Sequence, residues 1–95
     1  MGFNNLSDAE AERLAFLLEE LGETQQAIGK ILRHGYENYH PDFPGITNRK
    51  DLCREIGDVC AAIQMMMVVK DIEATTVRHF KALKLEKVKE YLHHQ

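Results

Sequence analysis

The chain has 95 residues, 44% of them hydrophobic, and a formal net charge of −3 at pH 7. This length fits one domain with a modest core, which a helical chain often completes by forming a homo-oligomer. The small negative charge argues against a general nucleic-acid binder, which needs a basic face, and no segment approaches the roughly 20 apolar residues of a membrane span.

The first long helix is expected from about residue 7 to residue 33. Ser7 and Glu10 form a capping-box signature, in which the hydroxyl and the carboxylate each accept from a backbone N–H group at the helix start. Apolar residues then recur at helical spacing, at Leu14, Leu17, Leu18, Leu21, Ile28 and Leu32. Gly35 offers a natural C-terminal stop.

The segment from residue 35 to residue 47 contains both prolines and three aromatic residues, which is typical of a loop that forms a binding surface. Thr47 or Asn48 is a candidate cap for a second helix at about 48–71, and a third, amphipathic helix is expected at about 73–92. The sequence therefore predicts an all-α fold, an antiparallel bundle of three main helices in a single domain of residues 1–95, completed by homo-oligomerisation.

Acidic pairs occur on each of the first two predicted helices. Glu20 and Glu23 are three residues apart, as are Glu55 and Asp58, so each pair projects from one helix face. The second pair continues an apolar line at helical spacing, formed by Ala62, Met65 and Val69. We therefore expect these carboxylates to face other parts of the protein rather than bulk solvent.

Four carboxylates that face one another repel by about 4 kcal/mol per close pair at about 4 Å with an effective dielectric constant near 20. A hard divalent cation relieves this repulsion, and ligation by oxygen alone favours Mg²⁺, with Mn²⁺ as a substitute. The alternative is a pair of solvated helix faces with ordinary ion pairs, since Arg54 stands four residues before Asp58.

The two motifs, Glu-Glu-x-x-Glu at 19–23 and Glu-Ile-Gly-Asp-Val at 55–59, together resemble the signature of the MazG-type all-α nucleoside triphosphate pyrophosphohydrolases. The resemblance spans about residues 7–72 and implies a homodimer or homotetramer. It implies cleavage of (d)NTPs or related nucleotides to a monophosphate and pyrophosphate. Glu20, Glu23, Glu55 and Asp58 match the family's Mg²⁺ ligands, and Glu19 or Glu23 is expected to orient the attacking water.

Candidate substrate-binding residues lie around these motifs. Lys30 and His34 continue the line of the acids along the first helix, Arg54 adjoins the second motif, and Tyr36 begins the aromatic loop. We expect the cations to meet phosphate or base, and Tyr36, Tyr39, His40 and Phe43 to form a stacking lid for a nucleobase. The alternatives are helix-end cations that interact with the helix dipole and aromatic residues that only anchor the loop.

The chain lacks an apolar N-terminal run typical of a signal peptide, and its two cysteines are seven residues apart on one predicted helix, too far apart to pair with each other there. We therefore expect a cytoplasmic protein of a bacterial or phage-infected cell, with a nucleotide as partner and neither a membrane nor stably bound nucleic acid. The alternative function is a non-enzymatic helical dimerisation or regulatory module, whose acids pair with a partner's lysines.

Overall fold

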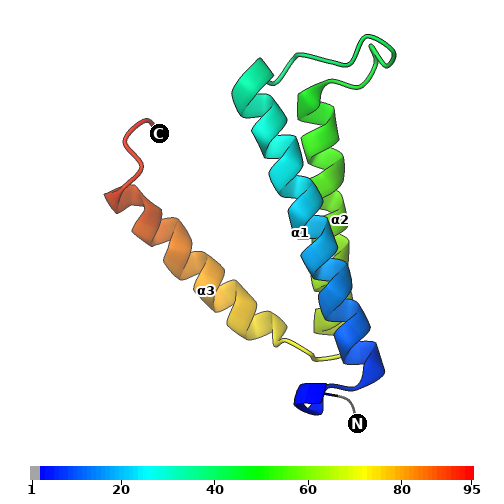
Figure 1. Cartoon of the computed structure of the whole chain (residues 1–95). Coiled ribbons are helices and arrows are strands. Elements are labelled where there is room, and N and C mark those ends of the chain that lie inside the picture. Colours follow the sequence, from blue (N-terminus) through cyan, green and yellow to red (C-terminus); the bar gives the residue numbers. More distant parts are fainter. Residues whose placement is uncertain (1–2) are drawn as a thin grey trace. The chain divides into compact units, whose positions relative to one another are not determined.

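The computed structural model describes residues 3–95. Those residues form three α-helices and no β-strand: α1 (Asp8–His34), α2 (Asn48–Val68) and α3 (Ala74–Lys87), with 3-10 turns at Phe3–Asn5 and Val88–Glu90 (Figure 1). The predicted all-α class is confirmed. The predicted helices begin within two residues of the observed ones, whereas α2 and α3 end earlier than the sequence suggested.

The start of α1 has the predicted cap. The Ser7 hydroxyl accepts from the backbone N–H of Glu10 at 3.1 Å, and the Ser7 backbone N–H donates to Glu10 Oε1 at 2.8 Å. At the other end, Gly35 takes a left-handed φ of 87° and donates its N–H to the Ile31 carbonyl at 2.7 Å. Such a positive φ is accessible to glycine without steric cost, which explains why α1 stops there.

The end of α2 is set by Lys70, which adopts a φ of 63°. The Lys70 N–H donates to the Met67 carbonyl and the Asp71 N–H donates to the Met66 carbonyl, which is the hydrogen-bond pattern of a Schellman motif. A lysine in this left-handed position gives no sequence signal, so the prediction that the helix continues to residue 71 was wrong by about one turn.

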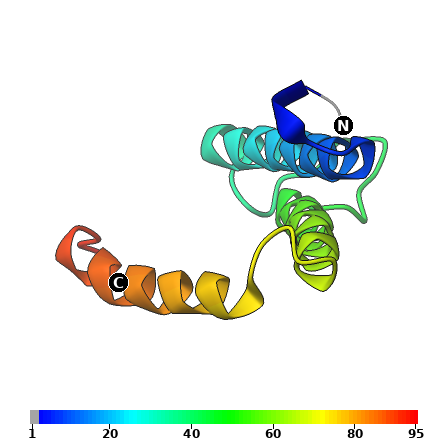
Figure 2. The same ribbon diagram turned by 90° about the horizontal axis from the view of Figure 1, so that it is seen from below.

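The chain divides into two compact units, one ending at Met65 and the other beginning at Met66. In the first unit α1 and α2 run antiparallel and side by side (Figures 1 and 2). Backbone hydrogen bonds from Asn48 to Asn38 and from Arg49 to Tyr36, each 2.8 Å long, close the connecting loop. The second unit contains α3 and its C-terminal 3-10 turn, and no residue of α3 is buried.

The buried face of α2 differs in part from the predicted one. Glu55 and Ala62 are buried as expected, but Met65 and Val69 are 48% and 51% exposed. At about 100° per residue, position 66 lies roughly 20° from the direction of Glu55, whereas position 65 lies roughly 80° away. Met66 is accordingly the buried residue of that turn, and Val69 lies beyond the end of α2.

The apolar stripe of α1 lies outside the α1–α2 interface. Glu20 and Ala27 are the buried residues of α1, and they lie on a different face from the stripe. The exposed large apolar residues of α1, between 43% and 82% exposed, are Leu14, Leu18, Leu21, Ile28 and Leu32. None of the helices in residues 3–95 has the length and apolar character needed to cross a bilayer.

Candidate metal centre

Two helices supply the acidic cluster. One carboxylate oxygen from each of Glu20, Glu23, Glu55 and Asp58 lies within 4.8 Å of the corresponding oxygens of the other three. The first pair comes from α1 and the second from α2, so the antiparallel packing of these helices brings together all four residues that the sequence singled out. Glu19, the fifth acid of the motifs, is exposed to solvent.

Two of the four carboxylates form the inner wall of the cluster. Glu20 and Glu55 are only 9% and 8% exposed, and the Oε2 atom of each is buried without a hydrogen-bond partner. Glu23 and Asp58 are more accessible and lie on the solvent side. Buried charged oxygens are normally paired, hydrogen-bonded or bound to a metal, so a proton or a cation could serve these two atoms as a partner.

The environment of Glu20 disfavours its negative charge. Burial raises the pKa of this carboxyl above its ordinary value, and the charges of Asp58, Glu55 and Glu19 raise it further. Because like charges within a few ångströms repel strongly in a partly desolvated site, the cluster favours any positive charge that enters it, whether a proton or a metal ion.

Glu55 is held from one side by a cation of its own helix. Arg54 Nη2 donates to Glu55 Oε1 at 3.2 Å and also to Asp51 Oδ1 at 2.5 Å. Burial and the neighbouring Glu23 carboxyl raise the pKa of Glu55, while Arg54 lowers it. The guanidinium thus engages Oε1, whereas Oε2 is buried without a partner.

This donor set fits a hard divalent cation. One oxygen from each of the four acids lies within 4.8 Å of the others, and oxygen ligands on opposite sides of an octahedral Mg²⁺ lie about 4.2 Å apart, so the four acids could share one such ion. Neither cysteine belongs to the cluster, and carboxylate oxygens are the ligands that Mg²⁺ and Mn²⁺ prefer.

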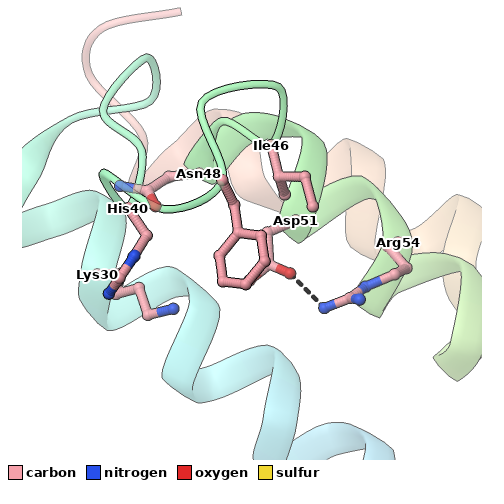
Figure 3. A pocket seen from close by; sticks show the side chains of 7 residues that line it. Lys30, His40, Ile46, Asn48, Asp51 and Arg54 are labelled. Atoms are coloured by element: carbon pink, nitrogen blue, oxygen red, sulfur yellow. Dashed lines mark hydrogen bonds and ion pairs between the residues drawn. The ribbon is translucent and has the colours of Figure 1, made fainter.

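A cavity of about 200 Å³ lies between α1, the connecting loop and the start of α2 (Figure 3). Its lining residues are Lys30, His40, Phe43, Ile46, Asn48, Asp51 and Arg54. The structure therefore brings two predicted substrate-binding residues, Lys30 and Arg54, together with two members of the predicted aromatic lid, His40 and Phe43.

The other predicted substrate-binding residues lie elsewhere. Tyr36 has the Arg49 guanidinium 4.2 Å above its ring centre, and Arg49 also bonds Glu37 at 2.7 Å. Tyr36 thus takes part in a local aromatic–cation contact and does not line the cavity. His34, the last residue of α1, is exposed and also does not line it.

Sequence reasoning missed two residues that shape the site. Asp51 stands four residues before Glu55, on the same helix face, and joins the acidic cluster to the cavity through Arg54. Thr24 stands one turn after Glu20, and its hydroxyl bonds the Glu20 carbonyl at 2.8 Å. Both residues follow the i, i+4 spacing of the recognised acids, which was the signal available to find them.

The resemblance to MazG-type enzymes is carried by the two acidic motifs of the sequence alone. No family model, curated protein or solved structure matches the chain.

Proposed function

We propose that this protein is a Mg²⁺-dependent nucleotide pyrophosphohydrolase that cleaves (d)NTPs or related nucleotides to a monophosphate and pyrophosphate. The observation that carries the proposal is the convergence of four carboxylates from α1 and α2, two of which keep a buried oxygen without a partner. The resemblance of both motifs to MazG-type enzymes agrees with this assignment, and the proposal includes a cytoplasmic location in a bacterial or phage-infected cell.

Each acid has a distinct role in this proposal. Glu20 and Glu55 are the inner ligands, and Glu23 and Asp58 close the site on the side from which a polyphosphate arrives. These four residues would hold a divalent cation, which would supply charge neutralisation for the phosphates and for the leaving group. Glu19, exposed beside Glu20, or Glu23 accepts a proton from the attacking water. The water oxygen bonds to phosphorus as the anhydride bond between the α and β phosphates breaks.

The direct test is pyrophosphate release from a panel of nucleotides with Mg²⁺, with Mn²⁺ and with chelator. We expect turnover only with metal, and we expect Glu20→Gln and Asp58→Asn to lower it by more than roughly 100-fold, since even outer-shell changes at metal sites cost 10- to 100-fold. Glu12→Gln, a matched change at an exposed acid of α1, should leave turnover unchanged. Full activity in the Glu20 and Asp58 variants would refute the assignment.

The exposed apolar stripe of α1 favours a second candidate, a helical dimerisation or regulatory module without catalysis. The stripe also suits the homodimer or homotetramer that we propose for the enzyme, so we propose it as the subunit interface in either case. Metal binding and pyrophosphate release separate the two functions, because a purely interacting module shows neither.

A further inference from the structure

The cavity beside the acidic cluster has two chemically different parts. Phe43 and Ile46, 60% and 45% exposed, contribute apolar surface from the loop. The His40 ring lies 5.8 Å from the Phe43 ring, so the loop presents two neighbouring aromatic faces. Asp51 and Asn48 contribute polar side chains from the start of α2 (Figure 3). One Asp51 oxygen accepts from Arg54, and the Asn48 amide nitrogen donates to the Gly35 carbonyl. An apolar wall with a few polar groups is the usual composition of a small-molecule site.

Two charged cations line the cavity, Lys30 and Arg54, and one of them is paired with protein acids. Arg54 is paired with Asp51 and Glu55, and the His40 Nδ1 accepts from the backbone N–H of Asp42 at 3.1 Å. The cavity therefore does not present the concentrated positive charge that a phosphate chain requires. A flat, neutral ring with polar edges suits these walls better, since aromatic faces stack on any base.

The distance from the cavity to the acidic cluster is short. Asp51 precedes Glu55 by four residues, about 6 Å along the axis of α2, and Lys30 follows Glu23 by seven residues, about 10 Å along α1. A ribose bridges a gap of this order between a base and its first phosphate. A volume near 200 Å³ is also small against the 300–1,000 Å³ of sites for drug-sized ligands, as expected for a pocket that takes one ring system.

We infer that this cavity binds the nucleobase of the nucleotide whose phosphates are held at the acidic cluster, with Phe43 as the stacking surface and Asp51 and Asn48 facing the base edge. The inference rests on the proposed function for the position of the phosphates. Base binding in the cavity can nevertheless be tested without catalysis, because a free nucleoside should bind there.

The test measures binding by calorimetry to the full chain in Mg²⁺. The probes are the four α,β-methylene deoxynucleoside triphosphates, which resist cleavage, and inorganic tripolyphosphate, which has no base. Phe43→Ala and Phe43→Leu should both lower the affinity for the best-bound nucleotide by roughly tenfold and leave the affinity for tripolyphosphate unchanged. A roughly tenfold loss is the effect expected when one base–aromatic stack is removed. Phe43→Leu keeps an apolar side chain on the loop, so loss of stacking is separated from loop collapse. Tyr91→Ala, at an exposed aromatic position outside the cavity lining and the predicted lid, should change neither affinity.

Nuclear magnetic resonance with the free nucleosides distinguishes the two levels of the proposal. If neither nucleotides nor tripolyphosphate bind with metal, while nucleosides shift the Phe43 and Ile46 side-chain signals, the pyrophosphohydrolase assignment fails and the base pocket stands. The base pocket is refuted if the Phe43 variants bind the nucleotides with wild-type affinity. It is also refuted if their affinity for tripolyphosphate falls by the same factor as their affinity for the nucleotides. The absence of shifts at Phe43 and Ile46 with every nucleoside and nucleotide would refute it as well.

Discussion

The Thr24 hydroxyl oxygen lies 3.4 Å from the Glu55 carbonyl oxygen, across the interface between α1 and α2. The same hydroxyl lies 2.8 Å from the Glu20 carbonyl, one turn earlier in α1. Thr24 thus joins the backbones that carry the two inner acids of the candidate metal centre. A half-buried hydroxyl in this position fixes how closely the two acidic pairs approach each other.

Replacing Thr24 with valine removes this hydroxyl and keeps the side-chain shape. We expect Thr24→Val to lower the free energy of unfolding by about 1 kcal/mol, the typical net contribution of one hydrogen bond. Urea denaturation measures this change, and Thr75→Val, at an exposed position of α3, is the matched control. Equal losses in the two variants would show that Thr24 acts through helix propensity and not through its contact with Glu55.

The buried carboxylates should make the stability of the wild type depend more strongly on metal than the stability of Glu20→Gln does. With chelator, the neutral amide removes repulsion from Asp58 and Glu55, so we expect this variant to melt at a higher temperature than the wild type. With Mg²⁺ at about 100 times its dissociation constant, the wild type should gain about 2.7 kcal/mol and the variant much less.

Differential scanning calorimetry with chelator and with Mg²⁺ measures both effects, and Glu12→Gln serves as the control at an exposed acid of the same helix. A wild type whose melting temperature does not respond to Mg²⁺ or Mn²⁺ would contradict the metal centre. A Glu20→Gln variant that is less stable than the wild type in chelator would contradict the repulsion between the clustered carboxylates.

The stability of the metal-free chain should fall as the pH rises above the acidic range. Burial and neighbouring carboxyls raise the folded-state pKa values of Glu20 and Glu55 above the ordinary 4.5. The folded chain therefore binds protons at these groups more tightly than the unfolded chain does. Their stabilising contribution is complete below about pH 4.5 and is lost as the pH rises through the raised pKa values.

Thermal melts in chelator between about pH 4 and about pH 7 test whether stability falls as the pH rises. The slope of stability against pH is set by the difference in the number of protons bound by the folded and unfolded chains. The variant with both Glu20→Gln and Glu55→Gln should have a flatter profile than the wild type over this range. Profiles of equal slope would show that other groups, and not the clustered carboxyls, govern the pH dependence.

Periodicity in the sequence was enough to find the helices and the acidic cluster. The spacing of Glu20 with Glu23 and of Glu55 with Asp58 dictates one face on each helix, and an antiparallel pairing brings those faces together. The end of α2 was missed because Lys70 adopts a left-handed φ that its residue type does not favour.

The cavity was only partly predictable, for a different reason. Its walls depend on the path of the loop between α1 and α2, and that path is fixed by contacts between residues distant in the sequence. The buried Asn48 donates its side-chain amide to the Gly35 carbonyl at 3.1 Å, and the Arg49 N–H bonds the Tyr36 carbonyl. Such contacts leave no repeating pattern in the sequence. The sequence therefore identified Phe43 and His40 as loop aromatics without placing them beside Lys30 and Arg54.

The exposed stripe of α1 gives the last prediction. Its positions, separated alternately by four and three residues, are Leu14, Leu18, Leu21, Gln25, Ile28 and Leu32. This is the a/d spacing of a coiled-coil seam with one polar member, a pattern that pairs well with a second helix of the same kind. Leu18 and Leu32 are 73% and 82% exposed, so the seam is open in the single chain.

We expect the wild type to be a dimer or tetramer by light scattering after size-exclusion chromatography, and Leu18→Glu to shift it to the monomer. Burying one leucine contributes about 1.5–3 kcal/mol, so placing a charge there should weaken association by at least roughly tenfold per copy. Gln26→Glu, an exposed position next to the seam, adds the same charge outside it and should leave the mass unchanged. A monomeric wild type, or a Leu18→Glu variant that keeps the wild-type mass, would exclude this stripe as the subunit interface.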